Sequence, residues 1–348
     1  MANQNTTIKT KSKVLDLNDL QLNTELREKL NQLIEEFSYI EALKIYDIPV
    51  DNKILLFGHT GCGKTATANA IGKALNKKVL TLNLGGFVSS RLGETGKNIT
   101  EIFRQCSYQD AILFIDEFDF IGKIRDYNNQ DSGEMQRLVN TLIQQIDNLS
   151  DSSLLICATN HLDIIDTALL RRFQLKLEYK LPNKKELDIY YNGLLAKFPN
   201  EINEINRIYD ISFAEAKDIV FQQIKAHIIE NEKQKKHLLF SYGTLKLEKV
   251  QLETYGRKLV GKKATLSGFE LKELEIKDSS VIAKSNTNIH PIAKKTNNDN
   301  DTIDGYIFEL TGAELLQTDA YEVADYKRVL ETTASGDKVW IYIAKNAI

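Results

Sequence analysis

A glycine-rich segment in the N-terminal half of the chain has residue types suited to holding phosphate groups. Residues 58–65 read Gly-His-Thr-Gly-Cys-Gly-Lys-Thr and satisfy the pattern G-x-x-x-x-G-K-S/T. Glycines allow backbone N–H groups to point at phosphate oxygens, while Lys64 can reach the β and γ oxygens and Thr65 offers a hydroxyl to Mg²⁺. The segment is therefore predicted to bind ATP through Gly58, His59, Thr60, Gly61, Cys62, Gly63, Lys64 and Thr65, with His59 and Cys62 in variable positions of the pattern.

Two carboxylates follow an apolar run further along the chain. Residues 112–115 are Ile-Leu-Phe-Ile, and Asp116 and Glu117 come directly after them. A strand that is buried up to its carboxyl end places the next side chains in the ligand crevice of a parallel sheet. Asp116 is therefore predicted to hold Mg²⁺, directly or through water, and Glu117 to polarise the attacking water as general base.

With these two motifs, residues 40–230 resemble the module of the AAA family of ATPases. In that family a further strand ends in a polar sensor residue, and Asn160 after the run Leu-Leu-Ile-Cys-Ala-Thr matches it. The family signature Asp-x-Ala-Leu-Leu-Arg-Arg-Phe is present at residues 166–173, which implies that Arg171 and Arg172 are arginine fingers for the ATP of a neighbouring subunit. The alternative is that both arginines cap the preceding helix and face water.

The resemblance also implies ATP as substrate, Mg²⁺ as metal ion and a homo-oligomeric ring, a hexamer, that remodels a macromolecular target. The sequence departs from the family pattern at two places. Arg91 stands where threading members carry a pore-loop aromatic residue, and it could contact an acidic chain or nucleic acid. The lid segment 212–218 has no arginine where many relatives keep a second sensor, and Lys217 is the nearest substitute.

A second set of motifs begins near residue 238. Tyr-Gly-Thr-Leu follows an apolar run, and its glycine can bring backbone N–H groups close to a small anion. Later segments follow in an order and spacing that resemble the gamma-glutamylcyclotransferase-like family over residues 238–345: Gln251–Gly256, Gly305–Leu310, Gln317–Glu322, Tyr326–Val329 and Val339–Tyr342.

This second resemblance implies an intramolecular reaction, in which an α-amine attacks a γ-glutamyl carbonyl and releases an amine and 5-oxoproline. Such a reaction needs a carboxylate to take the ammonium proton and return it to the leaving nitrogen. The family's glutamate matches Glu322, and the substrate would be held by Tyr242, Gly243, Thr244 and Leu245. The alternative is a fold retained as a binding or packing module.

The element pattern predicts an α/β domain with a parallel sheet covered on both faces, followed by a small helical lid. By the second resemblance the C-terminal domain is an α+β small barrel. The charged run 231–237 is interpreted as a linker. The predicted domains are 1–45, an N-terminal tail with helices; 46–182, the ATPase α/β subdomain; 183–235, the helical lid; and 238–348, the cyclotransferase-like domain.

Composition restricts the partners and the compartment. The 348 residues carry 45 basic and 48 acidic side chains, a formal net charge of −3, so charge alone does not indicate nucleic acid binding. Three cysteines do not suggest a disulfide framework, and no apolar run reaches 18 residues. We therefore expect a cytoplasmic protein without a membrane partner.

Three interpretations of function follow. The leading one is an ATP-hydrolysing AAA ATPase that acts as an oligomeric remodeller and carries a fused cyclotransferase-like domain. In the second, the C-terminal domain is a gamma-glutamylamine cyclotransferase that the ATPase regulates. In the third, the chain is a nucleic-acid-dependent helper ATPase with a non-catalytic C-terminal binding module.

Overall fold

The structure is a computed structural model that describes residues 15–84, 95–123, 132–275, 289–296, 298–322 and 326–345. The chain divides into two compact units, residues 1–222 and 223–348, and each is described by itself. Arg91, the predicted pore-loop residue, lies outside the described residues.

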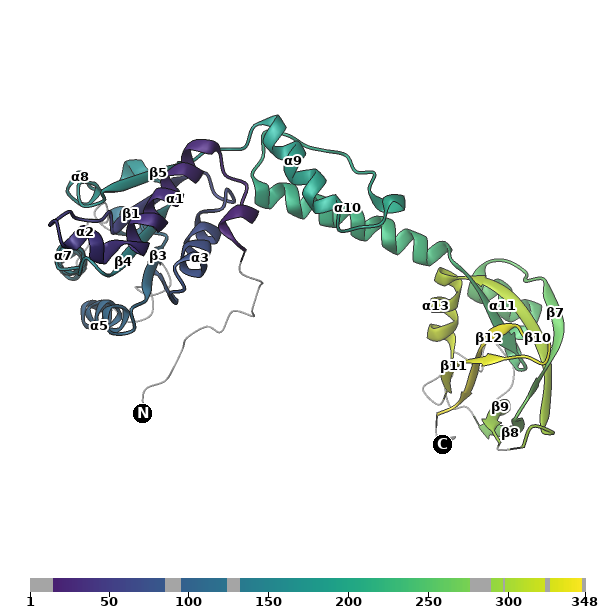
Figure 1. The fold of residues 1–348 in the computed structure, drawn as a ribbon. Coiled ribbons are helices and arrows are strands. Elements are labelled where there is room, and N and C mark those ends of the chain that lie inside the picture. Colours follow the sequence, from purple (N-terminus) through teal and green to yellow (C-terminus); the bar gives the residue numbers. More distant parts are fainter. Residues whose placement is uncertain are drawn as a thin grey trace. The chain divides into compact units, whose positions relative to one another are not determined.

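The N-terminal unit is built on a five-stranded parallel sheet with the strand order β2-β3-β4-β1-β5 (Figure 1). This is the predicted α/β fold, with β5 as a strand that the sequence pattern did not identify. The elements are α1 (Thr24–Ser38), α2 (Ile40–Lys44), β1 (Lys53–Gly58), α3 (Lys64–Ala74), β2 (Val79–Asn83), α5 (Thr95–Tyr108), β3 (Ile112–Asp116), α6 (Phe120–Lys123), α7 (Ser132–Asp147), β4 (Leu154–Thr159), α8 (Thr167–Leu170), β5 (Leu175–Tyr179), α9 (Lys184–Leu195) and α10 (Phe213–Gln234).

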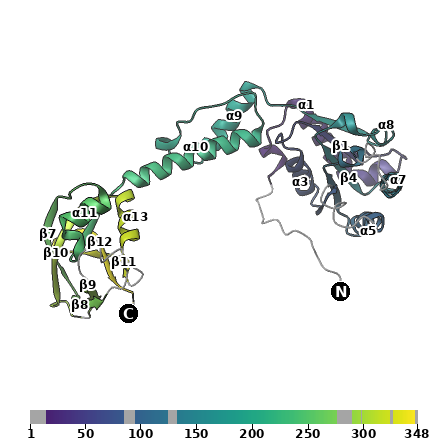
Figure 2. The same ribbon diagram turned by 180° about the vertical axis from the view of Figure 1, so that it is seen from behind.

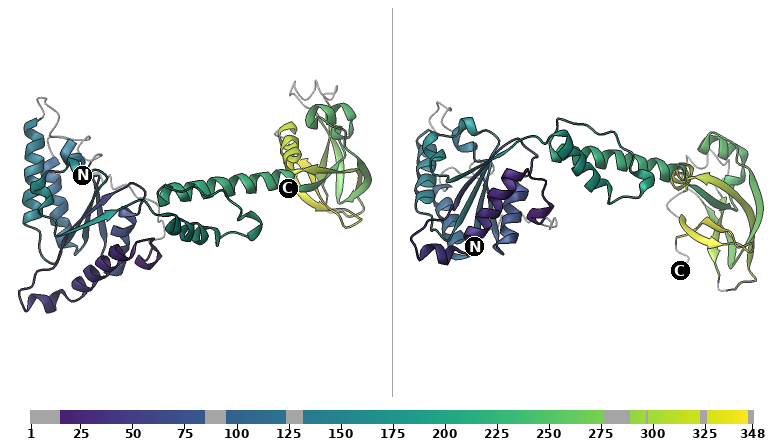
Figure 3. Two further views of the ribbon diagram at one scale, coloured as in Figure 1. Left: turned by 90° about the horizontal axis from the view of Figure 1, so that it is seen from above. Right: turned by 45° about the horizontal axis from the view of Figure 1, so that its top comes forward.

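Helices cover both faces of this sheet because its strands are apolar on both sides. On β3, Leu113 and Ile115 face the core formed with α5 and α7, whereas Ile112 and Phe114 face the core formed with α1 and α3. Successive strand side chains point to opposite faces, so an unbroken apolar run needs a cover on each side. In the view from above, α1 in purple and the helices of residues 95–108 and 132–147 in lighter blue lie on opposite sides of the sheet (Figure 3). Asp116 at the end of β3 and Asn160 just after β4 lie at the carboxyl edge of the sheet.

The last helix of the N-terminal unit is longer than the sequence suggested. The charged run 231–237 forms the last turn of α10 and the start of β6, so it has regular secondary structure almost throughout. Gln234 bonds to Glu230 and Lys235 pairs with Glu232 on the exposed side of this turn, so solvated charges extend the helix. The predicted lid boundary at residue 235 lies at the end of α10, while the compact units divide inside this helix, after Gln222.

The C-terminal unit contains a five-stranded mixed sheet with the order β11-β12-β6-β10-β7 and a separate β8–β9 hairpin (Figure 2). Strand β6 pairs in parallel with β12 and antiparallel with β10. The elements are β6 (Lys236–Ser241), α11 (Glu248–Tyr255), β7 (Gly261–Ser267), β8 (Phe269–Glu275), β9 (Ile289–Lys295), β10 (Thr302–Thr311), α13 (Gly312–Tyr321), β11 (Tyr326–Thr332) and β12 (Lys338–Ala344).

Two cores lie on the two faces of this sheet. Leu239 and Phe308 face α11 and α13, and the neighbouring residues Phe240 and Ile307 face the β8–β9 hairpin. The sheet is therefore enclosed between two helices and a hairpin, as expected for the predicted α+β domain. Among the described residues, no helix is both long and apolar enough to cross a membrane.

Candidate active sites

The glycine-rich loop joins β1 to α3 at the carboxyl edge of the parallel sheet. Gly58 has φ +117°, and a Cβ at this position would collide with the carbonyl oxygen of Tyr179 on β5. The N–H of His59 donates to the same carbonyl oxygen at 2.9 Å. Strand β5 therefore fixes the start of the loop by a contact that only glycine permits.

Lys64 spans the loop from the first turn of α3. Its Nζ donates to the carbonyl oxygens of Gly58 at 2.7 Å and of His59 at 2.8 Å, and the residue is 7% exposed. Burial lowers the pKa of this ammonium, while the charges of Asp116 and Asp119 raise it. A buried ammonium next to the backbone of a glycine-rich loop can donate hydrogen bonds to phosphate oxygens.

The predicted magnesium residues come together at the end of β3. Thr65 Oγ1 lies 3.4 Å from Asp116 Oδ2, and Asp116 Oδ1 accepts a hydrogen bond from the N–H of Glu117 at 3.0 Å. A hydroxyl and one carboxylate fit Mg²⁺, which usually takes one or two protein oxygens and completes its shell with phosphates and water. Glu117 is exposed, and its φ of +55° is unusual for a residue with a side chain.

Asn160 follows β4, the strand between β3 and β1, and is exposed. It lines an open cavity of about 580 Å³ together with Gly58, at the start of the phosphate loop, and Phe57. The predicted sensor and the predicted phosphate loop therefore border one space. The described residues place Lys64, Thr65, Asp116, Glu117 and Asn160 on the carboxyl edge of adjacent strands.

The two arginines after α8 have different surroundings. Arg171 is exposed, and among the described residues its side chain has no hydrogen bond or ion pair. Arg172 donates to both oxygens of Asp147 at 2.7 and 2.9 Å, and also to the carbonyl oxygen of Ala168 in α8 at 2.5 Å. Both residues therefore cap α8, Arg171 through its backbone N–H and Arg172 through its side chain, and only the side chain of Arg171 is exposed.

The lid reaches the phosphate loop through the start of α10. The N–H of Ala214 donates to the carbonyl oxygen of Gly61 at 3.1 Å, and a Cβ at Gly61 would crowd Ser212. Lys217 instead lies over the ring of Phe221, 5.5 Å from its centroid. The lid contact with the loop is thus made by backbone groups, and Lys217 interacts within the lid.

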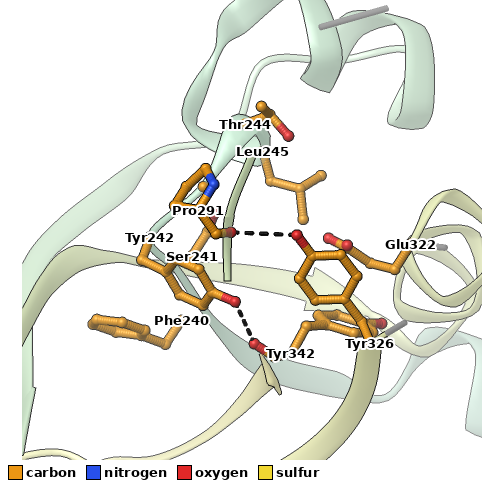
Figure 4. A pocket seen from close by; sticks show the side chains of 10 residues that line it. Phe240, Ser241, Tyr242, Thr244, Leu245, Pro291, Glu322, Tyr326 and Tyr342 are labelled. Atoms are coloured by element: carbon orange, nitrogen blue, oxygen red, sulfur yellow. Dashed lines mark hydrogen bonds between the residues drawn. The ribbon is translucent and has the colours of Figure 1, made fainter. Parts of the chain in front are cut away.

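The second candidate site is a pocket in the C-terminal domain (Figure 4). Its volume is about 30 Å³, so it accommodates a small polar group. The sequence-predicted residues Tyr242, Gly243, Thr244, Leu245 and Glu322 all line it, although 77 positions separate the last two. Residues at the end of β6 and just after α13 therefore form one site.

Glu322 is half-buried at one side of this pocket. Burial raises the pKa of its carboxyl group to about 8. The charge of Glu322 in turn contributes to the raised pKa values of Tyr242, Tyr255, Tyr321 and Tyr342, each dominated by burial. The carboxyl group therefore sits in an aromatic surrounding that favours its protonated form.

Hydrogen bonds fix the walls around Glu322. Tyr242 donates to the carbonyl oxygen of Tyr342 at 2.7 Å and accepts from the N–H of Ala293 at 2.9 Å. Tyr342 donates in turn to Asp319 at 2.7 Å, and Arg328 lies 2.9 Å from the other oxygen of Asp319. The sequence motifs contained Tyr342 without assigning it a role.

Tyr326 and Pro291 complete the pocket and were missed as site residues. Tyr326 donates to the carbonyl oxygen of Pro291 at 3.3 Å across the pocket (Figure 4). Tyr326 begins a segment that carried the family resemblance, which was a signal for it. Pro291 reaches the site only through the β8–β9 hairpin, and no sequence motif indicated this.

Comparisons with known proteins agree with both predicted domains. Residues 54–181 match the model of the ATPase family associated with various cellular activities (AAA), and residues 239–347 match that of gamma-glutamyl cyclotransferase, AIG2-like. The chain is 33% identical over 221 residues to an uncharacterized AAA family ATPase, y4kL, of Sinorhizobium fredii, covering 62% of this chain and 66% of that protein.

Two further similarities concern the ATPase region. An ATP-dependent zinc metalloprotease, FtsH 1, of Alkaliphilus metalliredigens is 31% identical over 173 residues, covering 48% of this chain and 29% of that protein. The crystal structure of the FIGL-1 AAA domain superimposes with a TM-score of 0.51 at 21% identity, covering 62% of this chain and 74% of that one, which supports the fold. The chain thus spans about two thirds of one relative and less than a third of the other. As the motifs predicted, it carries an AAA ATPase domain followed by a domain of the gamma-glutamyl cyclotransferase, AIG2-like, family.

Proposed function

We propose that the chain hydrolyses ATP at the carboxyl edge of its parallel sheet. The observation that carries this is the meeting of Lys64, Thr65, Asp116, Glu117 and Asn160 at one edge. Lys64 and the loop N–H groups bind the phosphates, and Thr65 and Asp116 hold Mg²⁺, which neutralises negative charge on the β and γ oxygens. Glu117 takes a proton from the attacking water, and Asn160 orients that water.

The second part of the proposal is that the ATPase works as a homo-oligomeric ring, a hexamer, that remodels a macromolecular target. Arg171 supports this because an exposed guanidinium is available to the γ-phosphate of a neighbouring subunit's ATP. Arg172 would contribute by position, since its bond to Asp147 fixes the chain next to Arg171. Hydrolysis would then change how subunits pack and so move a bound target.

The test compares Glu117→Gln with the wild-type chain. We expect Glu117→Gln to bind ATP within about threefold of wild-type affinity and to lose at least a hundredfold in turnover, because the amide cannot accept the proton. Glu101→Gln is a matched control, since Glu101 is an acid on α5 that pairs with Arg104 away from the site. Equal turnover by Glu117→Gln and wild type would contradict the assigned role.

The same variant tests the ring. Because Glu117→Gln would retain ATP, its particle size with and without ATP reports whether nucleotide drives assembly. We expect a hexamer with ATP and smaller species without it. A particle of unchanged size would contradict the arrangement in which Arg171 acts across a subunit boundary. In a separate measurement, stimulation of ATP turnover by DNA or RNA would favour the nucleic-acid alternative.

A second candidate function is γ-glutamylamine cyclotransfer in the C-terminal domain. The observation that favours it is the pairing of Glu322, with its pKa of about 8, and residues 242–245 in one pocket. The substrate's α-amine would attack the γ-carbonyl carbon, a new C–N bond would close the five-membered ring, and the γ C–N bond would break. Glu322 would carry the proton from the ammonium to the leaving amine, so that 5-oxoproline and a free amine result.

Release of 5-oxoproline from a panel of γ-glutamyl amines tests this second function. We expect product with the wild-type chain and at least a hundredfold less with Glu322→Gln. Glu309→Gln is the control, because Glu309 is exposed and pairs with Lys236. If the wild-type chain forms no product across the panel, the domain is a binding module.

A further inference from the structure

Two hydrogen bonds join the ends of β3 and β4 in the ATPase domain. The N–H of Phe118 donates to the carbonyl oxygen of Ala158 at 2.8 Å. One residue further along each chain segment, the hydroxyl of Thr159 donates to Asp119 Oδ1 at 3.1 Å. The two contacts tie the segment that carries Glu117 to the segment that carries Asn160.

The hydrogen bond between Thr159 and Asp119 is buried. Asp119 is 5% exposed and Thr159 is 1% exposed. The Thr159 hydroxyl also accepts the N–H of His161 at 3.0 Å, so its bonds hold the chain on both sides of Asn160. A hydrogen bond to a buried carboxylate is stronger than a neutral one, so loss of the Thr159 hydroxyl removes a strong contact between the two segments.

Glu117, which lies next to these two hydrogen bonds, has an unusual backbone conformation. Its φ of +55° is a conformation that costs a non-glycine residue about 1 kcal/mol or more, so it persists only where surrounding contacts impose it. The bond from Phe118 follows directly after Glu117, and the bond to Asp119 lies two residues after it. The contacts of Phe118 and Asp119 therefore hold the backbone turn in which Glu117 lies.

We propose that Asp119 and Thr159 are positioning residues for ATP hydrolysis, which set the placement of Glu117 relative to Asn160. This inference rests on the proposed ATPase function and on the roles given to those two residues. Neither Asp119 nor Thr159 needs to touch the nucleotide. Their effect is on the approach of the attacking water, which requires base and sensor to be held within a few tenths of an ångström.

Thr159→Val tests the inference because valine keeps the shape and removes the hydroxyl. We expect turnover at saturating ATP to fall at least tenfold, with the affinity for ATP within about twofold of wild type. Thr159→Ser restores a hydroxyl and should recover turnover to within threefold. Ser153→Ala is the matched control, because Ser153 precedes the opposite end of β4 and is a buried hydroxyl bonded to Ser107; it should leave turnover unchanged.

A double-mutant cycle of Thr159→Val and Asp119→Ala, with turnover measured at saturating ATP, is a second test. It does not depend on the behaviour of a single variant. If the two side chains act through their mutual bond, Thr159→Val should lower turnover far less in the Asp119→Ala background than in wild type. Additive losses, or Thr159→Val turnover within twofold of wild type, would overturn the inference while leaving the ATPase function intact. A wild-type chain without ATP turnover would overturn both.

Discussion

The two candidate sites of this chain differ in how far their residues are exposed to solvent. The candidate ATPase site is open, with Thr65, Glu117 and Asn160 all exposed along the carboxyl edge of the sheet. The C-terminal pocket is small and lined from one domain, with Tyr242 and Tyr342 locked by hydrogen bonds and Glu322 half-buried among them. One candidate site is an open edge of exposed polar side chains, and the other is a small pocket lined by tyrosines.

This difference follows from the chemistry proposed for each site. Triphosphate brings several negative charges and a metal ion, so its site offers backbone N–H groups, one lysine and an exposed arginine for a neighbour. Cyclisation of a γ-glutamyl group needs one carboxyl that can exchange a proton near neutral pH, and desolvation supplies it at Glu322. In the proposed functions, openness would therefore serve assembly in one domain, and enclosure would serve proton transfer in the other.

The largest expected effect concerns the open site. Arg171→Ala should lower ATP turnover a thousandfold or more, since arginine fingers contribute at least that much in related phosphoryl transfers. Arg172→Ala should mainly destabilise the domain, by about 1 kcal/mol, because it breaks the paired bond to Asp147. Steady-state turnover and thermal unfolding of both variants distinguish these outcomes, and equal loss of turnover in both would contradict the division of roles.

Mixed oligomers show whether Arg171 acts between subunits. Lys64→Ala subunits lack the phosphate contact but keep Arg171, whereas Arg171→Ala subunits keep the ATP site. Each variant alone should be nearly inactive, and mixing them should restore turnover at the interfaces where one subunit binds ATP and its neighbour supplies Arg171. If the mixture stays as inactive as its parts, Arg171 acts on its own subunit or not at all.

An intermediate effect concerns the enclosed site and its pH dependence. The raised pKa of Glu322 means that the folded domain keeps its proton up to about pH 8, while the unfolded chain releases it near the ordinary value of 4.5. Ionisation of Glu322 therefore favours the unfolded chain as the pH rises between these values. The contribution of Glu322 to the free energy of unfolding is fully present below about pH 4.5 and is lost as the pH rises through about 8. Unfolding midpoints should fall over this range in wild type and fall less in Glu322→Gln.

The measurement can be confined to this domain because the chain has one tryptophan, Trp340 on β12. Its fluorescence during urea unfolding reports the C-terminal domain within the intact chain. Glu309→Gln controls for loss of an exposed acid and should keep the wild-type dependence. Identical pH dependence in Glu322→Gln and wild type would show that Glu322 is not protonated in the folded domain at neutral pH.

The sequence predicted the residues of both sites better than it predicted the contacts that hold them. Local motifs identified Lys64, Asp116 and Glu322 because each motif is read within a few residues. Tyr179, whose carbonyl fixes the phosphate loop, was missed because no motif marks a backbone group on a distant strand. Pro291 was missed for the same reason, since only strand pairing brings it to the pocket.

The charged run before β6 shows a related limit. Its composition is typical of a loop, yet it continues α10, because charges on an exposed helical turn remain solvated. Charged residues are found both on exposed helix faces and in loops. Composition alone therefore does not distinguish the two. The backbone of this turn also packs closely, since a Cβ at Gly312, at the start of α13, would collide with the carbonyl oxygen of Glu232.

The smallest expected effect is that of Gly243→Ala in the C-terminal pocket, and Gly58→Ala in the phosphate loop is its contrast. Gly58 combines φ +117° with a carbonyl oxygen where a Cβ would stand, whereas Gly243 has φ −103° and its nearest foreign atom would be Pro291 Cγ at 3.9 Å. Gly58→Ala should therefore cost about 3 kcal/mol or more and weaken ATP binding, since strain and collision add. Gly243→Ala should change the Trp340 unfolding midpoint by less than about 1 kcal/mol, because an ordinary van der Waals contact replaces open space. Circular dichroism for the first and fluorescence for the second measure both, and a Gly58→Ala chain as stable as Gly243→Ala would mean that β5 does not fix the phosphate loop.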